Sequence, residues 1–153
     1  MIPKTEIRFS LRHNIRFNKK FSEKSLQKLK KNSKKFIMLY KKYINNILKS
    51  IEKYGSKKWE YDFIPIYIIG RKGISYSDPL TIKFRDNEKL MLIILIHELL
   101  HNNVFVKDKF KNRAEMHLYM ESLIKKIVKD INVNLDKELN QFIKMGREWH
   151  NLK

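Results

Sequence analysis

Residues 97–101 read HELLH, and their types and spacing suit hydrolytic chemistry. His97 and His101 are four positions apart, so on a helix with about 100° per residue both imidazoles lie on one face and can hold one Zn²⁺ through nitrogen. Glu98 is turned about 100° from His97. That offset suits a carboxylate that does not bind the metal but takes a proton from a metal-activated water. The pattern therefore predicts a zinc hydrolase with Glu98 as general base.

The alternative interpretation is a core helix that carries two incidental histidines. Both lie in the apolar run LMLIILIHELLHNN, residues 90–103. Histidines buried in such a run need hydrogen-bond partners, and leaving them without partners costs free energy. A helix that follows strands and is apolar over its first turns is also what a buried metal helix requires. The context therefore favours the metal site.

A third ligand is expected, because a catalytic zinc usually takes three protein ligands and a water. The chain has no cysteine, so the ligand must be His, Asp or Glu. The downstream candidates are Asp108, Glu115, His117 and Glu121. Glu115 is preferred, but it has a competing structural interpretation, because Asn112-x-x-Glu115 is also a capping box. His117 is the alternative. It lies about 200° from Glu115 on a helix, so only one of the two can face the metal.

HELLH followed by a Glu on the next helix resembles the gluzincins, zinc peptidases whose third ligand is a Glu on a "glutamate helix". The short span, the backing helix and the three short strands resemble the archaeal minigluzincins, the minimal members. The resemblance covers roughly residues 34–130. It implies that His97, His101 and Glu115 hold one zinc ion per chain and that Glu98 is the general base of peptide hydrolysis. It also implies that TIKF, residues 81–84, is the edge strand on which an extended peptide substrate pairs.

The resemblance leaves the oxyanion-stabilising residue open. Many gluzincins have an Asp four residues after the ligand Glu, and this chain has Tyr119 there. Tyr119 shares the helix face of Glu115 and is the catalytic candidate, with Tyr76 as the alternative. Minimal gluzincins are described as latent, so the chain is expected to be a zymogen held off by its own tail, about residues 146–153. Trp149 and His150 would dock there, although the N-terminal arm could play the same part.

A small α+β domain must position these residues. Alternating polarity over residues 5–17 predicts a strand with a turn at His13–Asn14, and this basic arm covers about residues 1–20. The three- and four-residue spacing of apolar residues predicts a backing helix from Ser22 to Tyr54, with a break near Asn32–Ser33. Strands are expected at 59–70, 73–78 and 80–84. Pro65 argues that the first of these three is an edge strand or has a bulge.

Three helices complete the expected domain. The HExxH helix begins after Asp86 or Asn87, the glutamate helix runs from Asn112 to Asp130, and the last helix spans 135–145 and ends at Gly146. The order predicts a single zincin-like domain over residues 1–153, with a three-stranded sheet.

The formal net charge is +18, from 34 Lys+Arg against 16 Asp+Glu, which favours acidic partners or nucleic acid. A Lys-rich genome composition explains the same excess. Two other functions follow from the charge: a zinc-binding module associated with DNA or RNA that is not proteolytic, and a basic peptidase acting on nucleic-acid-bound proteins. Weak nucleic-acid contact would use the arm, where Phe9 and Phe17 could stack on bases between Arg8, Arg12, Arg16, Lys19 and Lys20.

Two further observations concern location. The lack of cysteine is compatible with a reducing cytoplasm. The apolar run from Leu90 to Ile96 is too short to span a bilayer, and the N-terminus has no signal-peptide pattern. We therefore expect a cytoplasmic protein with no membrane contact, acting on a peptide or protein substrate.

Overall fold

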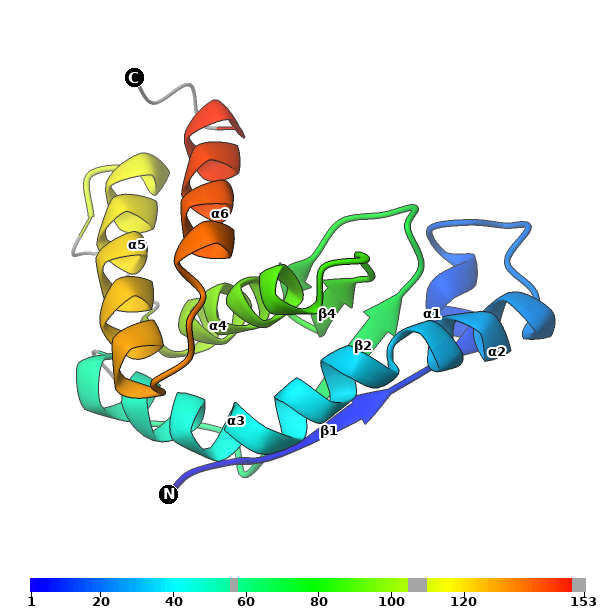
Figure 1. Ribbon diagram of the computed structural model, residues 1–153, viewed down its shortest axis with the longest axis horizontal. Helices are drawn as coiled ribbons and strands as arrows, with labels where there is room; N and C mark the ends of the chain where they lie inside the picture. The colour runs from blue at the N-terminus through cyan, green and yellow to red at the C-terminus, as the bar shows by residue number, and fades with distance from the viewer. Residues whose placement is uncertain (56–57, 105–109, 150–153) are drawn as a thin grey trace.

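The computed structural model describes residues 1–55, 58–104 and 110–149, and within these ranges the chain is α+β (Figure 1). The elements are β1 (Lys4–Arg8), α1 (Leu11–Ile15), α2 (Glu23–Asn32), α3 (Lys34–Tyr54), β2 (Phe63–Ile69), β3 (Tyr76–Ser77), β4 (Leu80–Lys83), α4 (Glu88–Val104), α5 (Arg113–Asp130) and α6 (Asp136–Trp149). The predicted break of the backing helix is confirmed, because Ser33 separates α2 from α3.

The four strands form a mixed sheet in the order β1-β2-β4-β3. β1 and β4 both run parallel to β2, and β3 is antiparallel to β4. The sheet therefore has one strand more than predicted, and β2 is internal rather than an edge strand. Within β2, the residues that pair with β4 are Tyr67–Ile69. Pro65, opposite Glu6 of β1, thus lies where β2 has a single neighbour, and there a missing N–H is tolerated.

The expected strand over residues 5–17 is wrong beyond β1, because α1 follows it. Ser10 caps α1, its side chain accepting a hydrogen bond from the backbone N–H of His13. Asn14 is 2% exposed. Its side-chain amide donates to the carbonyl of Ile68 at 3.3 Å, and its Oδ1 accepts from the N–H of Gly70 at 2.8 Å. The first 20 residues are therefore built into the fold and are not a separate arm.

Helices α3 and α4 pack against each other, and the sheet contributes its apolar face to their core. That face carries the buried side chains of Ile64, Ile66, Ile68, Leu80 and Ile82. At the β1 side, the Thr5 hydroxyl lies 2.7 Å from the hydroxyl of Tyr40 in α3. α3 runs along β1 in Figure 1, α5 contacts both α3 and α4, and α6 contacts α4.

Helix α4 is enclosed by its neighbours. It contacts α3, α5, α6, β3 and β4, and residues 90–96 are all buried. A helix surrounded on every side is apolar all round, which explains the continuous apolar run in the sequence. Asn87 caps it, since its Oδ1 accepts from the N–H of Leu90 at 3.0 Å.

The last helix extends further than predicted. α6 continues through Gly146 to Trp149 instead of ending at Gly146. A single glycine inside a helix costs only about 1 kcal/mol, and helix-forming residues follow it here. Residues 146–149 of the predicted tail are therefore helical, and residues 150–153 lie outside the described residues. None of the helices in the described ranges has the length and apolar composition needed to cross a membrane.

Candidate metal centre

Helix α4 brings His97 and His101 together, as their spacing predicts. Their Nε2 atoms are 3.1 Å apart, and the two rings lie nearly perpendicular with centroids 4.6 Å apart. Two nitrogens bound tetrahedrally to one zinc at about 2.05 Å would be about 3.3 Å apart. The observed separation therefore fits two ligands of a single ion.

Helix α5 supplies the third imidazole, that of His117. Its ring centroid lies 5.3 Å from those of both His97 and His101. One ring nitrogen from each residue can be chosen so that all three lie within 4.8 Å of one another. The three histidines are therefore close enough to bind one metal ion.

Glu115, the preferred third ligand in the sequence, is not part of this group. It is exposed, and its Oε2 accepts a hydrogen bond from the backbone N–H of Lys111 at 2.7 Å. Its own N–H donates to Oδ1 of Asn112 at 2.9 Å. Glu115 thus has the capping role that its position after Asn112 indicated. Since His117 faces the histidine pair, Glu115 lies about 200° away on α5.

Two other ligand candidates remain from the sequence, Glu121 and Asp108. Glu121 lines the pocket near the histidines, but its Oε1 accepts from Lys125 at 2.9 Å and from Arg147 at 3.4 Å. Asp108 lies outside the described residues. Among the described candidates, His117 is the one whose ring lies beside the pair.

Glu98 is 7% exposed, next to the histidines. Burial raises the pKa of its carboxyl to about 7, and the positive charge of Arg113 counters part of that rise. Glu98 lines the same pocket as the histidines, which is the position that proton transfer to and from a substrate requires. Burial also lowers the pKa of His101 to about 4, with Arg113 acting in the same direction. His101 is therefore neutral at pH 7, as a metal ligand must be.

A pocket of about 750 Å³ opens over the histidines and Glu98. Its volume is in the range of small-molecule and peptide sites. One wall is the extended segment 73–77, which includes β3, and α5 and α6 contribute the others. The sequence predicted 81–84 as the edge strand beside the groove, and this is wrong. β4 pairs with β2 on one side and β3 on the other, so β3 is the last strand of the sheet.

The two tyrosine candidates differ in position, because Tyr76 lines the pocket and Tyr119 does not. Tyr119 is two residues from His117, on another face of α5, where its ring lies 5.4 Å from that of Phe110. It is not among the described residues that line the pocket. Tyr76 lies opposite Thr81 in the β3–β4 pair, and its hydroxyl is 3.1 Å from Nε2 of His13. That contact lies on the α1 side of the sheet, away from α4.

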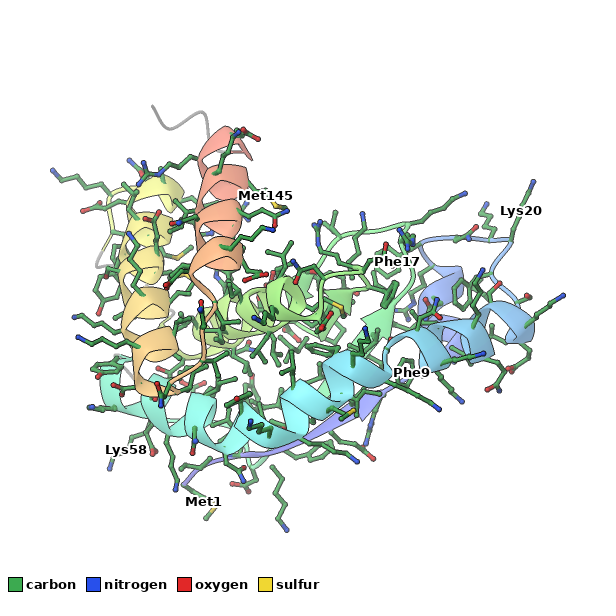
Figure 2. All side chains as sticks on the ribbon, viewed as in Figure 1. Met1, Phe9, Phe17, Lys20, Lys58 and Met145 are labelled. Carbon is green, nitrogen blue, oxygen red and sulfur yellow. The ribbon has the colours of Figure 1, made fainter. Side chains whose placement is uncertain are left out.

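Helix α6 covers part of the centre. The ring of Phe142 lies 5.2 Å from that of His97, and Ile143 and Met145 also line the pocket. Met145 is labelled on α6 in Figure 2. Helix α6 therefore forms one wall of the pocket, and latency stays a prediction. His150 lies outside the described residues.

The aromatic residues of the predicted nucleic-acid arm are engaged in packing. Phe9 packs against the core. Phe17 lies 5.8 Å from the ring of His13 and 6.0 Å from that of Tyr76. Lys20 projects outward at the end of the molecule formed by α1 and α2 (Figure 2). The basic side chains are exposed, and both phenylalanines are half-buried in packing contacts.

No protein-family model, curated protein or solved structure matches this chain. The fold class and the histidine group are therefore inferred from the sequence and structure of this chain alone. The class defined by them is an α+β protein with a candidate three-histidine metal centre.

Proposed function

We propose that the chain is a zinc-dependent peptidase with a zincin-like active site. The observation that carries the proposal is the meeting of three imidazoles beside the buried Glu98 in one pocket. Three neutral nitrogen ligands suit zinc, as in other catalytic zinc sites that keep a fourth position open. In this proposal the active-site helix and the general base follow the minigluzincin pattern. The third ligand departs from it, because His117 takes the place of Glu115.

The chemistry divides between the ion and the side chains. A bound zinc ion supplies a Lewis acid that polarises a carbonyl and lowers the pKa of water toward about 7. Glu98 accepts the proton of the attacking water as the new C–O bond forms at the peptide carbonyl. The C–N bond then breaks, and Glu98 returns the proton to the leaving amine. At neutral pH the products are one carboxylate and one protonated amine, which together contain both protons of the water, so one water is consumed for each peptide bond.

The segment 73–77 suits an extended substrate. β3 ends the sheet and lies in the pocket wall, so a peptide strand added there would pass the histidines. Backbone hydrogen bonds from an added strand give affinity without demanding particular side chains. A peptide or protein substrate is therefore the proposed partner. The cytoplasmic location expected from the cysteine-free sequence stays a prediction.

Metal analysis combined with cleavage of a peptide library tests the proposal. The wild-type chain should carry about one zinc and cleave peptides. His97→Ala, His101→Ala and His117→Ala should each lose most of the zinc. Glu115→Ala is the matched control on α5, and it should keep the metal.

Glu98→Gln separates binding from chemistry. It removes the base and no ligand, so it should retain zinc and lose hydrolysis. Zinc loss from Glu115→Ala together with full zinc in His117→Ala would restore Glu115 as the ligand. If the intact chain and the chain truncated after Met145 both bind zinc but leave the library intact, the peptidase proposal is contradicted and the non-catalytic module is favoured.

A further inference from the structure

Peptide hydrolysis at this site needs a hydrogen-bond donor for the oxyanion that forms on the carbonyl oxygen. The hydroxyl of Tyr76 is engaged with His13, and the ring of Tyr119 packs beside Phe110. A preorganised donor at that position commonly contributes 10²–10³ in rate, which is about 3–4 kcal/mol of barrier. The pocket contains a side chain of suitable charge on α5.

Arg113 is the first residue of α5, directly after the capping Asn112. It lies four residues before His117, so the two side chains share one face of the helix. Both line the pocket together with Glu98 and His101 of α4. Arg113 is exposed, and its positive charge lies in the lining of the pocket.

Arg113 of α5 lines the same pocket as Glu98 and His101 of α4. Its side chain therefore shares with them the space in which a bound carbonyl and the attacking water would meet. Its N–H groups also suit a developing oxyanion, because guanidinium remains charged at any working pH.

We infer that Arg113 is a catalytic residue of the proposed peptidase, whose guanidinium donates hydrogen bonds to the oxyanion formed at the scissile carbonyl. The inference rests on the proposed function. It assigns the role that the sequence left between Tyr119 and Tyr76.

Steady-state kinetics with a fluorogenic peptide provide the first test. Arg113→Ala should keep zinc and lower kcat by about 10²–10³, with KM little changed, because the contact forms only in the transition state. Arg113→Lys should keep part of the rate, and guanidinium ion added to Arg113→Ala should restore part of it. Lys111→Ala removes a positive charge two residues away, outside the described pocket lining, and should leave the rate unchanged.

Binding provides a second readout that does not depend on turnover. A phosphinic peptide, whose tetrahedral oxygens resemble the oxyanion, should bind zinc-loaded Arg113→Ala about 10²-fold more weakly than the wild type. The intact substrate peptide should bind equally well to Glu98→Gln and to the double variant Glu98→Gln/Arg113→Ala. Calorimetry measures both affinities.

Two results would overturn the inference. Equal affinity of wild type and Arg113→Ala for the phosphinic peptide would exclude an oxyanion contact. A raised KM with unchanged kcat would assign Arg113 to a carboxylate of the bound substrate instead. If the proposed peptidase function is wrong, the wild-type chain itself does not cleave peptides. That outcome is distinguishable from a wrong role for Arg113, which requires an active wild-type chain and an unaffected variant.

Discussion

Glu98 and His101 lie one turn apart on α4, and burial opposes ionisation at both. In zinc-free protein it raises the pKa of Glu98 from 4.5 to about 7 and lowers the pKa of His101 from 6.5 to about 4. Replacing each residue with Gln should therefore change the pH dependence of stability in opposite directions. The magnitude follows from the pKa values, because each pH unit of displacement corresponds to about 1.4 kcal/mol.

The sign differs between the two groups. Between pH 4.5 and about 7 the folded chain holds a proton on Glu98 that the unfolded chain releases. The contribution of Glu98 to stability is thus full below pH 4.5 and is lost as the pH rises through about 7. The unfolded chain holds a proton on His101 that the folded chain lacks, so the contribution of His101 is full above pH 6.5 and is lost as the pH falls through about 4. Each effect is about 3 kcal/mol, and in the wild type they largely cancel.

Urea denaturation with a metal chelator, from about pH 4 to about pH 7.5, measures both effects. Relative to the wild type, the free energy of unfolding of Glu98→Gln should rise by about 3 kcal/mol across this range. That of His101→Gln should fall by about the same amount. Glu23→Gln removes an exposed carboxyl on α2 and serves as the control. Parallel curves for the two variants and the wild type would refute the argument that burial controls these protonation states.

Three further predictions concern the rest of the chain. Truncation after Met145 removes the end of α6 from the pocket wall, so peptidase activity should rise at equal zinc content; equal rates would exclude this segment as an inhibitor. Asn14→Ala leaves the N–H of Gly70 and the carbonyl of Ile68 without their partner, and urea denaturation should show a loss of about 1–3 kcal/mol, which an unchanged midpoint would contradict. Duplex DNA should bind weakly, with affinity that falls steeply as salt increases and is the same in His97→Ala; tight, salt-insensitive binding would indicate a dedicated nucleic-acid site.

The sequence predicted the elements that depend on local periodicity. The four-residue spacing of His97 and His101 fixes both rings on one face of any helix they form, and the structure has Nε2 atoms 3.1 Å apart. The same local rules predicted the break between α2 and α3, the caps of α4 and α5, and the position of α4 behind short strands. The apolar run of residues 90–96 also predicted a buried helix. These features need only the turn of a helix and the chemistry of neighbouring residues.

The third imidazole could not be chosen from spacing. Glu115 and His117 are on the same helix, and periodicity states only that one of them faces α4. The rotation of α5 about its axis is set by burial of Met120, Leu123, Ile124 and Ile127 against neighbouring elements. That rotation turns His117 inward and leaves Glu115 at the capped, exposed end of the helix. The capping-box pattern was the one signal in the sequence for this outcome.

The edge of the sheet and the place of the N-terminal residues were likewise decided by tertiary structure. Alternating polarity marks β1 as a strand but does not name its partner, and β1 pairs with β2, about 59 residues further along the chain. The strand predicted at 73–78 is present as the two residues of β3, but nothing in its sequence showed that it ends the sheet and forms the pocket wall. Strand order and helix rotation depend on contacts between distant segments, and no local pattern in the sequence contains them.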